Sequence, residues 1–132
     1  MADPSSGAIV ITGASSGLGA ALARRYAGSG ARVGLIARRT AELAQLAQEF
    51  PGRCATHCAD VRDSIAMRRA AGALIARQGL PDIVIANAGI SAGTLTELVE
   101  DEQVFRDIFD INVIGMVNTF QPYVAAMRER GH

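Results

Sequence analysis

Residues 8–19 read AIVITGASSGLG, and this stretch decides the fold. Its first residues form an apolar, β-branched run, which is typical of a buried strand. A loop punctuated by glycines follows, and a helical pattern begins directly after the loop. Because a helix N-terminus leaves its first backbone N–H groups unpaired and carries partial positive charge, the stretch predicts a site for a phosphate-sized anion.

The residues of the loop have separate expected roles. We expect Gly13 to allow the sharp exit from the strand, Gly17 the close passage of a pyrophosphate, and Gly19 the tight packing of helix on strand. Ser15 and Ser16 add hydroxyl donors. The spacing Thr-Gly-x-x-x-Gly-x-Gly lacks the Lys-Ser/Thr pair of a nucleoside-triphosphate loop. Taken alone, the loop is also compatible with an ordinary turn between a strand and a helix.

The composition favours one domain that binds neither nucleic acid nor membrane. The 132 residues are enough for one domain with a core, and the formal net charge is zero. No apolar run approaches the roughly 20 residues that span a bilayer. Residues 1–7 contain neither a basic region nor an apolar run, so we expect a short tail, no secretion signal and a cytoplasmic protein.

The two cysteines, Cys54 and Cys58, flank His57 in the run Cys-Ala-Thr-His-Cys. This spacing matches no usual zinc pattern, and the segment has the pattern of a strand, on which His57 faces away from both thiols. We expect buried structural thiols in a reduced, cytosolic protein, and no metal site.

Expected strands and helices alternate along the chain. After the first strand, further strands are expected at 32–36, 54–59 and 82–86, with helices at about 18–28, 40–50, 64–79 and 101–130. Short connections between such elements imply right-handed βαβ units and a parallel sheet. The expected fold class is therefore α/β, with the strands in the order 3-2-1-4.

Two of the helices carry apolar stripes that we expect to face the sheet. In the first helix the stripe is Leu18, Leu22 and Tyr26, and in the long helix it is Val104, Ile108, Ile111, Ile114 and Val117. Leu18 is also a candidate cofactor contact, because it lies inside the glycine loop. Pro122 is expected to bend the long helix or to open a turn in it.

A ligand crevice is expected between the first and fourth strands, at their carboxyl ends, because the strand order reverses there. The loop from Gly13 to Gly19 borders it on one side. Asn87-Ala88-Gly89, which closes the fourth strand, borders it on the other. Gly89 either serves the turn alone or lets the backbone pass close under a nicotinamide ribose.

The end of the second strand favours NADP(H) over NAD(H). An acidic residue about 20 positions past the glycine loop would bind the ribose hydroxyls of NAD. Ala37 stands there instead, followed by Arg38 and Arg39. A guanidinium can bind a 2′-phosphate with two hydrogen bonds, whereas a carboxylate repels it. The alternative is that both arginines are solvated surface charges.

Asp60 closes the third strand, and Val61 follows it. Because this strand ends at the outer wall of the expected crevice, Asp60 is a candidate acceptor for the amino group of an adenine. The alternatives are a plain turn aspartate or a cap for the following helix.

With these pieces in place, the sequence resembles the short-chain dehydrogenase/reductase family. The resemblance covers nearly the whole chain and rests on motifs in the family's order and separation: Thr12-Gly13-x-x-x-Gly17-x-Gly19, Asp60-Val61, Asn87-Ala88-Gly89 and Asp110-Ile111-Asn112-Val113. It implies a doubly wound fold of the Rossmann type, a nicotinamide cofactor, and hydride transfer between a carbonyl and an alcohol of a small-molecule substrate.

The resemblance also implies roles for individual residues. It implies that Asp60 and Val61 hold the adenine and that Asn87 and Gly89 line the ribose. Asn112 resembles the family's asparagine that bends the long helix and positions a water in the proton relay, which makes it the catalytic candidate. Taken alone, Asn112 is a helix residue bonded to backbone.

The sequence departs from the family pattern in two places. Ala86 stands where the family often has asparagine. The family's serine and Tyr-x-x-x-Lys are not matched, since Met127 stands four residues after Tyr123 and the chain has no lysine. The sequence ends at His132, where the family's fifth strand is expected. We therefore expect residues 1–132 to be an incomplete NAD(P)-binding domain that lacks the acid–base half and is inactive alone.

Three hypotheses follow. The first is the N-terminal portion of an NADP(H)-dependent oxidoreductase, and the second is a non-catalytic dinucleotide-binding module or inactive truncated paralogue. The third, a methyltransferase, is disfavoured because it needs an acidic residue near Ala37. The first is favoured because the apolar strand at 82–86 is otherwise an open edge. By resemblance, the long helix is expected to contribute to a homo-oligomer.

Overall fold

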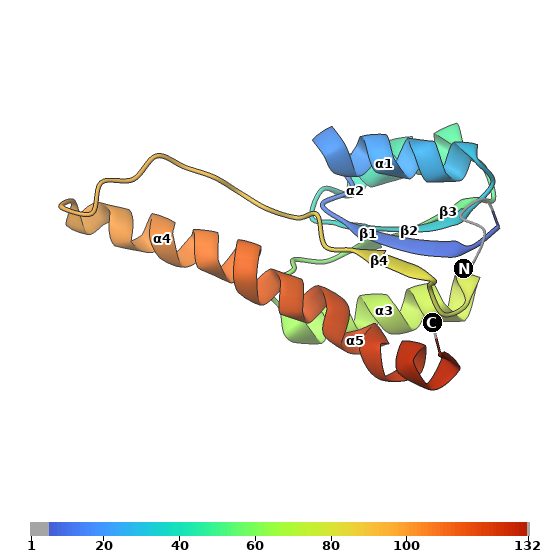
Figure 1. The fold of residues 1–132 in the computed structure, drawn as a ribbon. Helices are drawn as coiled ribbons and strands as arrows, with labels where there is room; N and C mark the ends of the chain where they lie inside the picture. Colours follow the sequence, from blue (N-terminus) through green and yellow to red (C-terminus); the bar gives the residue numbers. More distant parts are fainter. Residues whose placement is uncertain (1–5, 132) are drawn as a thin grey trace.

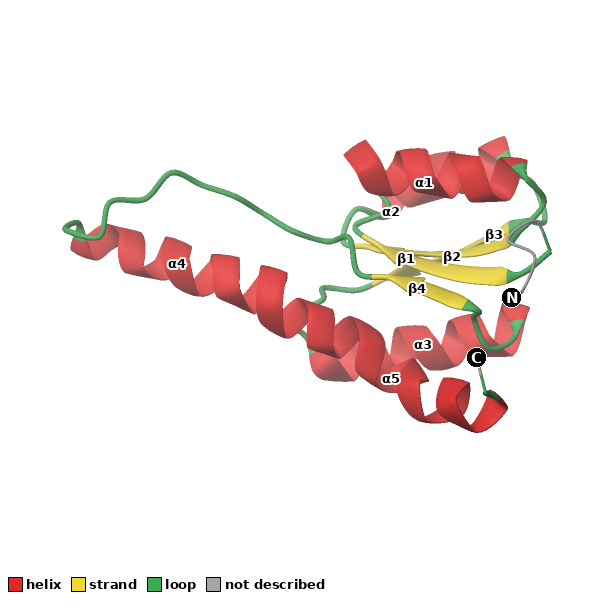
Figure 2. Ribbon diagram, in the orientation of Figure 1, coloured by secondary structure: helices red, strands yellow, loops and turns green. Residues whose placement is uncertain are grey.

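Four parallel strands form one sheet in the order β3-β2-β1-β4, as the sequence predicts. The computed structural model describes residues 6–131, so residues 1–5 of the expected tail and His132 lie outside it. Figure 2 shows the strands in yellow: β1 (Ala8–Thr12), β2 (Arg32–Ala37), β3 (Cys54–Cys58) and β4 (Ile83–Ile85). Because β1 pairs in parallel with both β2 and β4, the carboxyl ends of these strands meet at one edge of the sheet.

Helices cover both faces of the sheet. Figure 1 shows α1 (Gly17–Gly28) and α2 (Thr40–Glu49) on one face, and α3 (Ser64–Gln78) and α5 (Gly115–Arg130) on the other. A 3₁₀ turn (Val99–Asp101) leads into α4 (Glu102–Phe109), which continues through a π-helical turn (Asp110–Ile114) into α5. Within residues 6–131, no helix combines the length and the hydropathy needed to cross a bilayer.

The core has two halves, one on each side of the sheet. Successive side chains of a strand point to opposite faces. Ile9 and Ile11 of β1 therefore pack toward α1 and α2, and Val10 between them packs toward α3 and α5. All three side chains are fully buried. Burial on both faces explains why this strand is a continuous apolar run without alternation.

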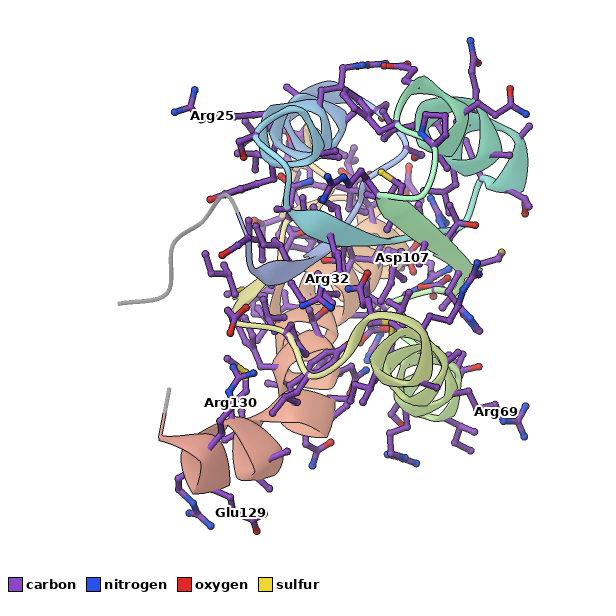
Figure 3. The ribbon with its side chains drawn as sticks, turned by 90° about the vertical axis from the view of Figure 1, so that its right-hand side faces the viewer. Arg25, Arg32, Arg69, Asp107, Glu129 and Arg130 are labelled. Atoms are coloured by element: carbon purple, nitrogen blue, oxygen red, sulfur yellow. The ribbon has the colours of Figure 1, made fainter. Side chains whose placement is uncertain are left out.

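The C-terminal end of α5 is fastened to the start of β4. Arg130, labelled in Figure 3, donates to the Leu80 carbonyl at 3.0 Å and to the Pro81 carbonyl at 2.7 Å. Its guanidinium also lies 3.2 Å from the Asp82 carboxylate, which accepts from the Ala8 N–H at 2.8 Å. These contacts fix the register of the long helix against the edge of the sheet.

The predicted inward stripe of the long helix is wrong beyond Ile111. The side chains of Ile114 and Val117 are 49% and 55% exposed. The buried residues of α5 are small or polar, with one aromatic: Gly115, Asn118, Thr119 and Tyr123. The π-helical turn inserts a residue relative to a regular helix, which rotates the apolar positions after it away from the sheet. Pro122 neither ends the helix nor opens a turn, since α5 continues to Arg130.

Two further burial predictions are wrong. Leu18 is 67% exposed, because the first turn of α1 projects past the end of the sheet. Cys58 is exposed and Cys54 half-buried, because β3 is the outer strand of the described sheet. The thiol of Cys58 lies 3.3 Å from the Arg38 carbonyl oxygen, so it stands beside the end of β2.

Candidate cofactor site

The side chain of Thr12 joins the carboxyl ends of β1 and β4. Thr12 is fully buried, and its Oγ1 accepts from the Asn87 N–H at 3.1 Å and the Ala88 N–H at 3.3 Å. The Asn87 side chain donates through Nδ2 to the Gly13 carbonyl at 3.2 Å. The two loops predicted to border the crevice therefore share one hydrogen-bond network. Sequence reasoning quoted Thr12 in its motif without assigning it this role.

The three glycines of the loop are required for different reasons. Gly13 has a φ of 64°, and a Cβ there would lie 2.8 Å from the Ala88 Cα. A Cβ on Gly19 would overlap the Gly13 carbonyl, so this glycine lets α1 approach the loop. Gly17 has a φ of 55°, but a Cβ there would meet no atom within 4 Å. The open space beside Gly17, at the N-terminus of α1, fits a bound anion.

Arg39 lies across this loop. Its Nη2 donates to Ser16 Oγ at 2.9 Å and to Ser15 Oγ at 3.3 Å. Its Nη1 lies 3.4 Å from the Glu42 carboxylate on α2. The structure thus brings an arginine from the end of β2 to the predicted anion site, although the two segments lie more than one element apart in the sequence.

A pocket of about 400 Å³ opens at this edge of the sheet. A volume of this size lies within the range typical of small-molecule and cofactor sites. Of the predicted cofactor-binding residues, those that line it are Gly13, Ser15, Ser16, Leu18, Arg38, Arg39, Asp60, Val61, Asn87, Ala88 and Gly89. Gly17 and Gly19 belong to the same loop but do not line this pocket. The exposed position of Leu18 places it on the pocket wall, away from the core.

Four lining residues were not among the predicted site residues: Ala37, Ala59, Ile90 and Ile111. All four are direct neighbours of predicted residues in the sequence. All four are apolar side chains. The carboxyl ends of the strands were the useful signal for Ala37, Ala59 and Ile90, since the strand ends at this edge contribute to one wall. Ile111 belongs instead to the motif of the long helix.

Asp60 is held by the side chain two positions after it. Its carboxylate accepts from Arg62 Nη2 at 2.7 Å, from Arg62 Nε at 3.1 Å and from the Arg62 N–H at 3.0 Å. These side-chain hydrogen bonds hold the pKa of Asp60 below its usual value, so the group is an anionic acceptor at neutral pH. Arg62 also lies 3.8 Å from Asp107 of α4, which Figure 3 labels.

Asn112 lies in the π-helical turn and holds the loop that follows β4. Its Oδ1 accepts from the Ile90 N–H at 2.8 Å, and its Nδ2 donates to the Ile90 carbonyl at 2.8 Å. A Cβ on Gly89 would lie 3.3 Å from Asn112 Oδ1, so the two segments are closely packed. The asparagine thus contacts the pocket wall through Ile90 and Ile111, its neighbour in the sequence.

The cysteine segment has no metal-binding geometry. Within residues 6–131, no three His, Cys, Asp or Glu side chains lie close enough together to hold a metal ion. Burial raises the pKa of the Cys54 thiol, which favours its protonated form. The segment contributes to the site only through Cys58, which adjoins the backbone of Arg38.

A family model described as short chain dehydrogenase matches residues 7–132. The chain belongs to the short-chain dehydrogenase family. The predicted resemblance is therefore confirmed, and so is the Rossmann-type fold with its strand order. Short-chain dehydrogenases are oxidoreductases, and the pocket described above lies at the carboxyl ends of the strands, where open α/β sheets bind their ligands.

The chain is similar to known proteins in both sequence and structure. The chain is 36% identical over 126 residues to a 3-dehydrosphinganine reductase of Arabidopsis thaliana, covering 92% of this chain and 37% of that protein. It superimposes on a short-chain dehydrogenase of Streptomyces avermitilis with a TM-score of 0.87 and 34% identity, covering 96% of this chain and 47% of the other. It superimposes on an alcohol dehydrogenase of the archaeon Thermococcus sibiricus, crystallised with 5-hydroxy-NADP, with a TM-score of 0.84 and 31% identity, covering 95% and 55%.

The chain spans less than half the length of the curated relatives it matches. The matched portion of this short-chain dehydrogenase holds the glycine loop, the strand ends and the long helix. It does not contain the Tyr-x-x-x-Lys motif expected from the family resemblance, because the sequence has no lysine.

Proposed function

We propose that this chain is the cofactor-binding part of an NADP(H)-dependent oxidoreductase that interconverts a carbonyl and an alcohol on a small-molecule substrate. Residues 1–132 then form a single NAD(P)-binding domain that is incomplete without an acid–base segment. The share of the relatives' length that the chain spans supports this division. We expect the 132 residues alone to bind cofactor without turnover.

The observation that carries the proposal is the charge at the end of β2. Arg38 and Arg39 line the pocket, and Ala37 occupies the position where a carboxylate would bind ribose hydroxyls. Two guanidinium groups at this position favour a ligand with a 2′-phosphate. The Thermococcus sibiricus relative, crystallised with 5-hydroxy-NADP, supports the same choice.

The other residues of the pocket have distinct proposed roles. The loop of Gly13 and Gly17 binds the pyrophosphate at the N-terminus of α1. Asp60 and Val61 bind the adenine, and residues 60–62 are here called the adenine wall. Gly89 passes under the nicotinamide ribose. The bound nicotinamide supplies or accepts the hydride.

Asn112 is the catalytic candidate within this chain. We propose that it orders the nicotinamide end of the site, where a water of the proton relay is held. Its two hydrogen bonds to Ile90 leave the side chain in one orientation and support such a role. The serine, tyrosine and lysine that the family resemblance implies are expected outside these residues.

We further propose a homo-oligomer. Exposed apolar side chains form a stripe along the long helix: Phe105, Phe109, Val113, Met116, Val117 and Val124. Such a stripe is typical of an interface with a second chain or with further elements of the same protein. The expected cytoplasmic location and the expected lack of nucleic-acid and membrane partners stay predictions.

Affinity for the two dinucleotides tests the cofactor assignment. We expect Arg38→Ala to weaken NADPH binding by about tenfold or more, the value of a charge-assisted hydrogen bond, and to change NADH binding by less than about twofold. The quenching or enhancement of dihydronicotinamide fluorescence measures both. Arg25→Ala is the matched control, because Arg25 is exposed on α1 and points away from the molecule in Figure 3.

The possible results separate the assignment to NADP(H) from the cofactor function itself. Equal losses of NADPH and NADH affinity in Arg38→Ala remove the assignment to NADP(H) and leave a dinucleotide site. No binding of either dinucleotide by the unmodified protein contradicts the cofactor function itself.

A further inference from the structure

The adenine wall, residues 60–62, is held from behind by α5. Asn118 of α5 is only 8% exposed. Its Nδ2 donates to the Val61 carbonyl at 2.8 Å and lies 3.4 Å from the Arg62 carbonyl. A backbone carbonyl at the base of a pocket needs a partner, because an unpaired buried acceptor is costly. Asn118 supplies that partner from an element that is distant in the sequence.

Gly115, one turn before Asn118, lets the helix come this close. A Cβ at this position would lie 2.6 Å from Val61 Cγ2 and 3.1 Å from Val61 Cβ. Valine is stiff about its χ1 angle, so it would have to move as a whole. The backbone of α5 is therefore in direct contact with the adenine wall, so a movement of the helix at Gly115 would move Val61 as well.

The front of the wall is fixed by a turn. The Asp63 N–H donates to the Asp60 carbonyl at 3.0 Å, and Asp63 caps α3 through its side chain. Arg62 links the Asp60 carboxylate to Asp107 of α4. The orientation of Asp60 and Val61 toward the pocket thus depends on both α3 and the long helix.

We propose that Asn118 is a positioning residue for the adenine end of the cofactor site. Through the Val61 carbonyl it sets the angle at which the Val61 N–H and the Asp60 carboxylate face the ligand. This inference rests on the proposed function, in which Asp60 and Val61 bind the adenine. Asn118 does not line the pocket, so it acts only through the wall.

Two partial ligands separate this role from a general loss of structure. Adenosine 2′,5′-bisphosphate occupies only the adenine end, and reduced nicotinamide mononucleotide occupies only the other. We expect Asn118→Leu, which keeps the branching and the number of side-chain heavy atoms but removes the donor, to weaken the binding of adenosine 2′,5′-bisphosphate by about tenfold. The affinity for reduced nicotinamide mononucleotide should stay within about twofold. Calorimetry and dihydronicotinamide fluorescence measure the two.

Thr119→Val is the matched control. Thr119 is also buried, but its hydroxyl donates within the helix to the Gly115 carbonyl at 2.7 Å and not to the wall. Its replacement should change both affinities by less than about twofold, even where it lowers the free energy of unfolding. Gly115→Ala is an independent variant that keeps the Asn118 side chain and displaces Val61 instead. It should reproduce the selective loss of adenosine 2′,5′-bisphosphate, and it decides the matter if Asn118→Leu does not fold.

The proposal is overturned if Asn118→Leu keeps adenosine 2′,5′-bisphosphate affinity within about twofold, or if it weakens both partial ligands equally. It is also overturned if Thr119→Val gives the same selective loss. If the wild-type protein binds adenosine 2′,5′-bisphosphate and the variants bind it equally well, only this inference is refuted. A wild-type protein that does not bind it refutes the proposed function as well.

Discussion

Asn112 holds both backbone polar groups of Ile90, accepting from its N–H and donating to its carbonyl, each at 2.8 Å. The amide side chain therefore pairs with Ile90 as a neighbouring strand would. Asn112 lies in the π-helical turn of the long helix, and Ile90 lies in the pocket wall after β4. The irregular turn thus has a local purpose, because it presents this side chain toward the loop.

Replacing Asn112 should release that loop. We expect Asn112→Leu to lower the free energy of unfolding by about 1–2 kcal/mol, the value of two lost hydrogen bonds at a half-buried position. Amide hydrogen exchange at Ile90 should become faster in the same variant, because the N–H loses its acceptor. Denaturant unfolding and exchange measured by NMR are the two readouts.

Gln103→Leu serves as the comparison for Asn112→Leu. Gln103 donates to Asp107 on the exposed surface of α4, at 3.0 Å, so its loss should cost less than about 0.5 kcal/mol. Unchanged exchange at Ile90 in Asn112→Leu would show that the loop is held by other contacts.

Most of the fold could be predicted from the sequence because local patterns and the sheet rules agree. The run at residues 8–12 is buried on both faces, and the strand order follows from right-handed crossovers of short connections. The start of α3 fits the sequence pattern, which allows either Asp63 or Ser64 as the cap; in the structure the Asp63 carboxylate accepts from the Ile65 and Ala66 N–H groups. Residues at the strand ends that border the pocket could be predicted from the sequence for the same reason.

The long helix shows where such reasoning fails. A search for apolar residues at helical spacing selects Ile114 and Val117, yet both are exposed. The face that packs on the protein carries Gly115 and Asn118, because close approach to Val61 needs a missing side chain and a buried carbonyl needs a donor. Neither requirement is visible in hydropathy. The network around Thr12 was missed likewise, because its partners lie in a loop far along the sequence.

Two glycines of the anion loop should respond differently to alanine. Gly13→Ala combines a positive φ with a Cβ placed 2.8 Å from the Ala88 backbone, so we expect a loss of more than about 2 kcal/mol in the free energy of unfolding. Gly17→Ala has the positive φ but no atom within 4 Å of the new Cβ. Its cost should be only about 1–2 kcal/mol. Denaturant unfolding of both variants measures the difference.

Ligand binding should reverse the order of these two variants. NADPH binding by the two variants is compared at a temperature where Gly13→Ala is folded. The new methyl group of Gly17→Ala occupies the space proposed for the pyrophosphate. We therefore expect Gly17→Ala to weaken NADPH binding more than its small effect on stability implies. Equal stability losses in the two variants would contradict the different surroundings of Gly13 and Gly17.

The hydroxyl of Tyr123 is buried on α5 and meets no hydrogen-bond partner among the described residues. Burial raises the pKa of Tyr123 to about 12. Between the unfolded value of about 10 and this folded value, only the unfolded state loses the proton, so stability should fall by about 1.4 kcal/mol per pH unit. Tyr123→Phe should be more stable by about 1 kcal/mol at neutral pH and lack this alkaline loss. Urea unfolding measured as a function of pH tests both the gain at neutral pH and the alkaline loss of stability, with Tyr26→Phe as the control. If Tyr123→Phe loses as much stability at alkaline pH as the wild-type protein, the loss belongs to another titrating group.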